Sequence, residues 1–132
     1  MSRIVIDARR DELIQEAWVV RQHARVMGKT RVGCAVLSAE GNITSGCNVE
    51  HRYRCHDIHA EVNALSSLVA QGDSLALGVL VVAERTKFTP CGSCMDWIFE
   101  LGGPECWVGF QPSRQTDVVW YRAVELMPHY PS

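Results

Sequence analysis

Apolar side chains recur along the chain with two periods, which predict helices alternating with strands. Residues 11–27 are apolar at near-helical spacing and Gly28 follows, so we predict a helix that ends before this glycine. Residues 31–37 and 43–49 are largely apolar runs that flank the turn-prone segment 38–42. This arrangement is typical of a β-hairpin.

The middle of the chain changes period twice. Residues 58–71 return to helical spacing, and the helix they predict carries His59 and Glu61 in its first turn. Residues 77–83 form a continuous apolar run, which is too apolar for a strand with one face in water. We therefore predict a central strand that is covered on both faces.

The last third of the chain predicts one further helix and one short strand. The helix covers residues 91–101, with Thr89 as candidate N-cap and Pro90 as its first residue, and the strand covers residues 106–110. Residues 118–127 fit either type of element. The order of the elements predicts an α/β fold in which helices cover a mixed sheet.

Length and charge limit the class of protein. A chain of 132 residues suits a single domain over residues 1–132, and its formal net charge is −2. No signal peptide is recognisable, and the longest apolar run, residues 75–83, is too short to span a membrane. We therefore expect a cytoplasmic protein with no membrane partner. Nucleic acid is not expected as a partner either, because no long basic stripe is present.

Two cysteines at the start of a predicted helix suggest a metal site. Cys91 and Cys94 can point both sulfurs at one place, where the helix dipole favours the thiolate form. Alone, this motif also fits a redox pair or half of a structural zinc site. The segment His59-Ala-Glu61 completes the pattern H-x-E followed by P-C-x-x-C, which marks zinc-dependent base deaminases.

The three metal ligands predicted by this pattern are His59, Cys91 and Cys94, holding one Zn²⁺ per subunit. Three protein ligands leave a position for water, as catalytic zinc requires, whereas a fourth ligand from Cys55 or His56 would close the site. Zinc lowers the pKa of bound water to roughly 7. Glu61 is then expected to carry the proton from this water to the ring and to the departing amino group.

Beyond the metal motif, V-G-C-A-V-L at residues 32–37 and G-C-N-V-E at residues 46–50 resemble the cytidine deaminase and blasticidin S deaminase family. The resemblance implies a three-layer α-β-α fold with a mixed, roughly five-stranded sheet. It implies a zinc-dependent aminohydrolase that converts a cytosine nucleoside and water to the uracil-type product and ammonia. It also implies a homo-oligomer, a tetramer or a dimer, and assigns substrate binding to Asn48, Glu50 and Ala60.

The chain departs from this family at several positions. His59 stands where the cytidine enzymes usually have cysteine, and Val62 stands where an arginine usually follows. The two changes agree, because two thiolates and a neutral imidazole balance Zn²⁺, whereas three thiolates leave a negative charge for an arginine to offset. Thr30 stands where the family often has an aromatic residue that packs on the base, so the resemblance does not define how the base is recognised. Arg52 and Arg54 lie near the expected sugar site.

Several other functions therefore remain open. The substrate could be cytidine, deoxycytidine, an aminonucleoside antibiotic such as blasticidin S, or a modified cytosine. Polynucleotide editing uses the same motif but is disfavoured by the acidic charge balance. A zinc-stabilised module without catalysis is the alternative of another class, and it predicts that Glu61 is dispensable.

Overall fold

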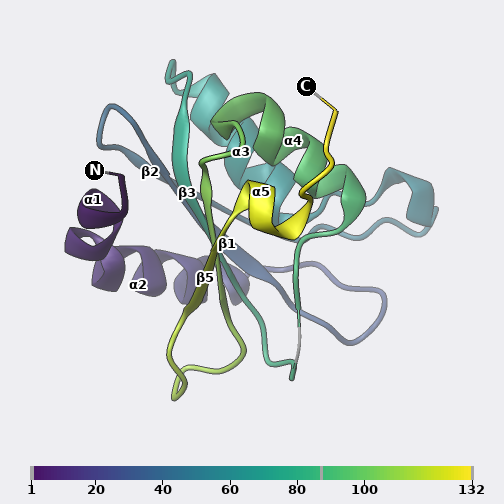
Figure 1. Ribbon diagram of the computed structural model, residues 1–132. Helices are drawn as coiled ribbons and strands as arrows, with labels where there is room; N and C mark the ends of the chain where they lie inside the picture. The colour runs from purple at the N-terminus through teal and green to yellow at the C-terminus, as the bar shows by residue number, and fades with distance from the viewer. Residues whose placement is uncertain (1, 87, 132) are drawn as a thin grey trace.

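The structure, a computed structural model, describes residues 2–86 and 88–131 (Figure 1). Five strands form one sheet in the order β2-β1-β3-β4-β5, in which β3 and β4 are parallel and the other neighbours are antiparallel. In chain order the elements are α1 (Ser2–Ala8), α2 (Arg10–Arg21), β1 (Gly33–Ser38), β2 (Ile43–Cys47), the 3₁₀ turn η1 (Arg54–His56), α3 (Ala60–Ala70), β3 (Ala76–Val82), α4 (Gly92–Gly102), β4 (Trp107–Gln111), β5 (Val119–Arg122) and α5 (Ala123–Leu126).

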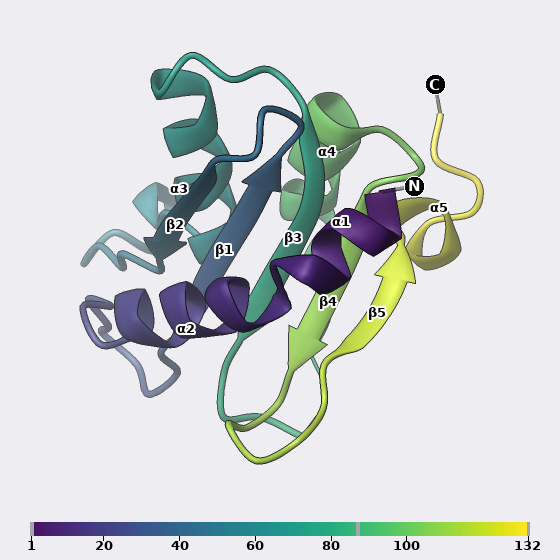
Figure 2. The same cartoon turned by 90° about the vertical axis from the view of Figure 1, so that its left-hand side faces the viewer.

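The sheet separates two apolar layers. Helices α1 and α2 lie on one face, whereas α3 and α4 lie on the other (Figures 1 and 2). Successive side chains of a strand point to opposite faces, so Val36 of β1 packs with the α3 side and Leu37 with the α2 side. Because β1 and β3 are central and covered on both faces, both strands are apolar along almost their whole length. The three-layer fold with five strands is confirmed.

Helix α3 lies unusually close to β2. At Gly46 of β2 a Cβ atom would be only 2.5 Å from the backbone nitrogen of Ala64, and 2.6 Å from the Cβ of Asn63. Asn63 also donates a side-chain hydrogen bond to the carbonyl of Cys47. The hairpin therefore fixes the position of α3, and with it the residues at the start of that helix.

The first predicted helix is wrong at its C-terminal end. The helix was expected to reach residue 27, but α2 ends at Arg21 and the following residues form a loop. Arg25 explains the difference, because its backbone N–H donates to Asn48 and its carbonyl accepts from Glu50. Pairing with a distant strand end thus outweighs the helical period. The N-terminal helix α1 was not predicted.

The other element boundaries need smaller corrections. Cys91, and not Thr89, is the N-cap of α4, and His59 is the N-cap of α3. The segment 118–127, which fitted strand or helix, contains both: β5 and then α5. Among residues 2–86 and 88–131, no helix is long and apolar enough to cross a membrane.

We predict that Gly46→Ala loosens the contact between β2 and α3. The added methyl group overlaps backbone atoms, so we expect the free energy of unfolding to fall by about 1–3 kcal/mol or more. Urea denaturation measures this change. The matched control is Gly28→Ala, whose new Cβ would have its nearest neighbour at 4.0 Å. Equal stability of the two variants would contradict the close packing described here.

Candidate active site and metal centre

His59, Cys91 and Cys94 meet at one point although they come from two helices. His59 and Cys91 are the N-caps of α3 and α4, and Cys94 lies in the first turn of α4. The His59 Nδ1 atom lies 3.3 Å from each sulfur, and the two sulfurs are 3.6 Å apart. The two helix N-termini therefore converge on a single small volume.

These distances are close to those of a tetrahedral zinc site, the two nitrogen–sulfur distances being slightly shorter. Zinc bonds of about 2.3 Å to sulfur and about 2.0–2.1 Å to nitrogen would separate the donor atoms by roughly 3.5–3.8 Å. His59 and Cys91 are exposed, whereas Cys94 is buried. A metal held by the three residues would thus remain accessible from the exposed side.

The surroundings of Cys94 also favour a cation. Burial above all, and the negative charge of Glu61 in addition, raise the pKa of the Cys94 thiol well above its ordinary value. The thiolate form therefore needs a positive partner at this position. Zn²⁺ supplies that charge, so the residues present fit this metal.

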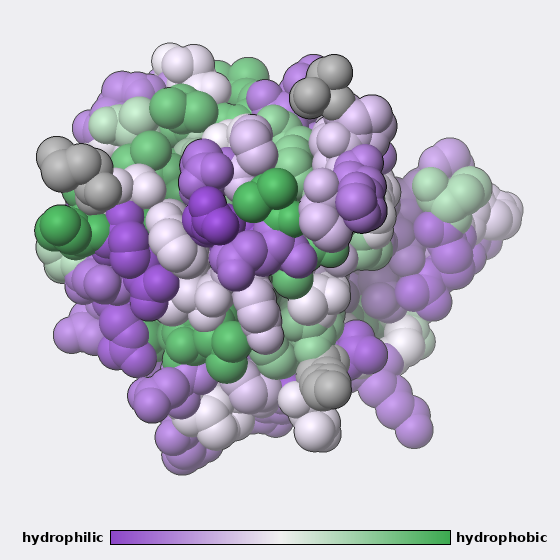
Figure 3. Space-filling view, viewed as in Figure 1, coloured by the Kyte–Doolittle hydropathy of each residue, from purple (hydrophilic) through white to green (hydrophobic). Residues whose placement is uncertain are grey.

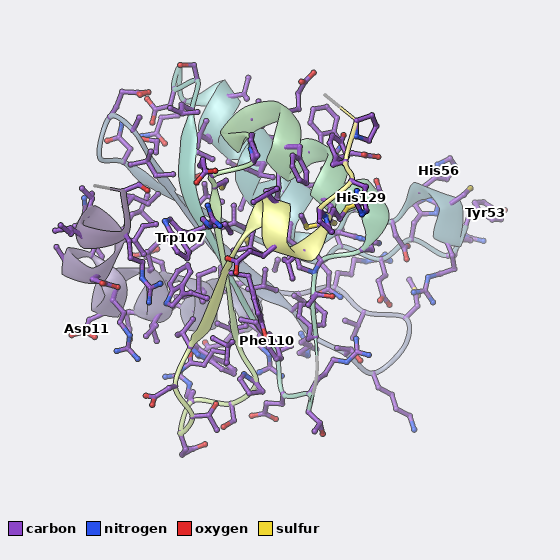
Figure 4. All side chains as sticks on the ribbon, in the orientation of Figure 1. Asp11, Tyr53, His56, Trp107, Phe110 and His129 are labelled. Carbon is purple, nitrogen blue, oxygen red and sulfur yellow. The ribbon has the colours of Figure 1, made fainter. Side chains whose placement is uncertain are left out.

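The fourth ligands considered from sequence do not join the group. Among the described residues, His59, Cys91 and Cys94 form the one group of three or more such side chains whose donor atoms all lie within 4.8 Å of one another. Cys55 and His56 belong to η1, on a loop that projects from the body of the protein (Figures 1 and 4). Figure 3 shows that the surface of this projection is largely hydrophilic.

Glu61 lies beside the three donors, in the first turn of α3. Only 3% of the residue is exposed. Burial raises the pKa of its carboxyl group, whereas its own backbone N–H, the charge of His59 and a hydrogen bond with Cys94 oppose this shift. A carboxyl group that is nearly buried but borders a cavity is suited to exchange protons with a bound molecule.

A cavity of about 410 Å³ opens above Glu61. It is bounded by the loop that follows α2, the end of β2, the residues before α3 and the loop that leads into α4. Its lining residues are Thr30, Val32, Asn48, Glu50, Arg54, Asp57, Ile58, His59, Ala60, Glu61, Arg85, Phe88, Thr89 and Cys91. Cavities of this size hold small molecules.

Asn48 and Glu50 border the cavity, and both also hold its wall in place. The side-chain carbonyl of Asn48 accepts a hydrogen bond from the Val32 N–H, and its amide donates to the carbonyl of Thr30. The Glu50 carboxylate accepts from the backbone N–H groups of Met27 and Gly28. These two backbone donors keep the pKa of Glu50 below its ordinary value.

Two arginines near the expected sugar site have different surroundings. Arg54 binds the carboxylates of Glu50 and Asp57, at 3.2 Å and 2.8 Å. Arg52 does not border the cavity, and its guanidinium lies 5.7 Å from the ring centroid of Tyr53. Figure 4 places Tyr53 on the projecting loop. Arg54 is thus a structural link between two acidic residues of the cavity wall.

Sequence reasoning missed Arg85 and Phe88, which border the cavity from the loop after β3. Their position shortly before P-C-x-x-C was the available signal. At the C-terminus, Tyr130 stacks on Phe99 with the ring centroids 3.9 Å apart, and its hydroxyl donates to Asp96. Tyr130 therefore packs against α4 of its own chain.

Comparisons with known proteins agree with this arrangement. The family described as the cytidine and deoxycytidylate deaminase zinc-binding region matches residues 8–110. A cytidine deaminase of Halalkalibacterium halodurans is 30% identical over 90% of this chain and 91% of its own. A probable cytidine deaminase of Dictyostelium discoideum is 35% identical over 88 residues, which make up 65% of this chain and 59% of that protein.

Solved structures extend the likeness to the whole fold. The crystal structure of a cytidine deaminase from Burkholderia pseudomallei superposes with a TM-score of 0.82 and 31% identity, over 90% of this chain and 96% of that one. The fold and the site thus define a zinc-dependent deaminase that works by hydrolysis. The chain belongs to the cytidine deaminase family.

We predict that Cys91→Ser weakens zinc binding. Loss of a group that only hydrogen-bonds a metal ligand typically lowers the affinity for the metal by roughly 10- to 100-fold. Loss of a ligand itself should lower the affinity for zinc by more. Competition with a chromophoric chelator measures the affinity. Cys55→Ser is the matched control, because Cys55 is also an exposed free cysteine but lies outside the group. Equal zinc affinity in both variants would contradict the assignment of the site.

Proposed function

We propose that this protein deaminates a cytosine nucleoside, cytidine or deoxycytidine, by hydrolysis and releases ammonia. The observation that carries the proposal is the position of Glu61, a buried carboxyl group beside the His59, Cys91 and Cys94 donors at a cavity. The names of the relatives from Halalkalibacterium halodurans and Burkholderia pseudomallei support the substrate class.

In the proposed mechanism His59, Cys91 and Cys94 hold the metal, one ion per subunit. Zinc, when bound, makes water ionise near neutral pH. Glu61 accepts the proton released by water and passes it to the ring nitrogen beside the carbon under attack. The same carboxylate then takes the proton of the hydroxyl group added to the ring carbon and gives it to the departing amino group, so that the C–N bond breaks, ammonia leaves and a carbonyl group remains. Its near-complete burial keeps bulk water from competing for this proton.

Substrate positioning is proposed for Asn48, Glu50 and Ala60. The backbone bonds of Asn48 and Glu50 fix the directions of both polar groups before a ligand binds, which reduces the entropy lost on binding. Asn48 keeps one amide hydrogen, and Glu50 keeps lone pairs, for sugar hydroxyl groups. Ala60 borders the cavity between the metal ligand and Glu61, where a small side chain leaves room for the base.

Assembly and location extend the proposal. Several apolar side chains are exposed on the α3 and α4 side and on edge strand β5, including Val69, Trp97 and Val119, whose exposed fractions are 51%, 48% and 46%. Such groups support a homo-oligomer, a tetramer or a dimer. The cytoplasm is the proposed location.

We predict that Glu61→Gln retains zinc but loses deaminase activity. Removal of a general acid and base costs about 10²- to 10⁴-fold in kcat. The measurement is ultraviolet absorbance during incubation with cytidine, deoxycytidine, cytosine, blasticidin S and a 5-substituted cytidine. Glu40→Gln, an exposed change far from the motif, is the control. If zinc-loaded wild type and Glu61→Gln are equally inert on all five compounds, a zinc module without catalysis becomes the better explanation.

A second prediction separates sugar binding from the support of the wall. Glu50→Gln preserves the side-chain shape and an acceptor for Met27 and Gly28, but it removes the charge that Arg54 binds. We expect KM for cytidine to rise about 10-fold or more, in line with a lost hydrogen bond to a charged group. Free cytosine has no sugar, so its kcat/KM should change much less. A parallel loss for both compounds would mean that the residue acts only on the structure of the wall.

A further inference from the structure

The arginine on the acidic side of the cavity is already engaged by carboxylates. Arg54 donates to Asp57 at 2.8 Å and lies 3.2 Å from the second carboxylate oxygen of Glu50. One guanidinium thus serves two carboxylates, and the backbone N–H groups of Met27 and Gly28 complete the environment of Glu50. This wall therefore does not provide an unmatched positive charge for a ligand.

Arg85 is a second cation at the cavity, and its surroundings are different. It follows β3 on the loop that leads to α4, where it is exposed and borders the cavity. Among residues 2–86 and 88–131, no carboxylate oxygen lies within 4.0 Å of its guanidinium nitrogens. The adjacent Glu84 lies 4.0 Å from Arg21 instead. The charge of Arg85 is thus not balanced by a described residue.

Phe88 gives this guanidinium a defined place. The Arg85 guanidinium carbon lies 5.3 Å from the Phe88 ring centroid, which is within the range of a cation–π contact. The Phe88 ring packs in turn against Phe110, with 5.3 Å between the centroids. Figure 4 labels Phe110 at the lower part of the sheet. A cation–π contact uses the face of the guanidinium and leaves its N–H donors free for a ligand.

Arg85 also stands between two hollows. Besides the main cavity it borders a neighbouring hollow that Glu84, Thr86, Pro112 and Thr116 complete. A substituent that extends from a bound nucleoside past the loop therefore meets Arg85, which borders both hollows. A planar fork of N–H donors at this place matches phosphate or carboxylate oxygens.

We propose that Arg85, held by Phe88, recognises an anionic group on the sugar of the substrate. The substrate is then a cytosine nucleoside that carries a phosphate or a carboxylate, and Arg85 is a specificity-determining residue. This inference rests on the proposed deaminase function, whose site it extends. In this inference Phe88 holds Arg85 at the edge of the cavity. This role is independent of Thr30, which stands where the family usually has an aromatic residue.

The test compares three substrates that differ only at the 5′ position: cytidine, cytidine 5′-monophosphate and cytidine oxidised to the 5′-carboxylate. With zinc-loaded wild type, kcat/KM for at least one anion should exceed that for cytidine by about 10-fold or more, and the excess should shrink as salt is added. In Arg85→Gln the ratio of anion to cytidine should fall about 10- to 100-fold. The arm that responds identifies phosphate or carboxylate as the natural group.

The matched control is Arg52→Gln. Arg52 is also an exposed arginine whose guanidinium lies near an aromatic ring, but it does not border the cavity. Its substitution should leave the ratio of anion to cytidine at the wild-type value. The inference is overturned if wild type prefers neither anion, if Arg85→Gln slows all three substrates in proportion, or if both variants reduce the ratio equally.

Binding separates this inference from the proposed reaction. Calorimetry with zinc-loaded Glu61→Gln protein, with and without Arg85→Gln, gives Kd for the same three compounds without turnover. If wild type deaminates nothing, yet an anion binds 10-fold or more tighter than cytidine through Arg85, the reaction is wrong and the anion site stands. If the three compounds bind equally, or none binds, the anion site is wrong whatever the wild type deaminates.

Discussion

The site depends on the convergence of two helix N-termini. α3 and α4 belong to the same layer, and their caps bring the ring nitrogen of His59 within 3.3 Å of both sulfurs. The two helices are positioned independently. α3 is held by its close approach to Gly46, and α4 lies in the connection between the parallel strands β3 and β4. The parallel pair requires a crossover helix, so the topology itself supplies α4.

The electrostatic environment of the site favours a bound metal ion. Cys94 and Glu61 are buried side by side; burial raises the pKa of both groups, and the charge of Glu61 raises the pKa of the Cys94 thiol further. A divalent cation beside the two groups would attract both negative charges and lower the pKa of both. Binding of zinc should therefore also stabilise the convergence of the two helices. The departure from the family at His59 fits the same balance, since a neutral imidazole adds no further negative charge.

Much of this arrangement could be predicted from the sequence, and the remainder has a common physical reason. Periodicity reports which face of an element is buried, so the apolar strand β3 was foreseen, and so was helix α3, which was expected over residues 58–71. The two halves of the metal motif, residues 59–61 and 90–94, are likewise short sequence patterns that can be recognised without the structure. Pairings between distant segments leave no period, which is why the end of α2 was misplaced and why the link from Arg54 to Glu50 and the position of Arg85 emerged only from the structure.

The wall of the cavity explains why selectivity should come from more than the sugar hydroxyl groups. The Asn48 amide already makes two backbone bonds, and the Glu50 carboxylate accepts two more and binds Arg54. What remains for a substrate is one hydrogen of the Asn48 amide, the second lone pair of its carbonyl oxygen, and one lone pair of the Glu50 oxygen that binds Arg54. Those few contacts suit a ribose but distinguish poorly between its derivatives. The guanidinium of Arg85, whose donors are uncommitted to described residues, is the group that can distinguish them.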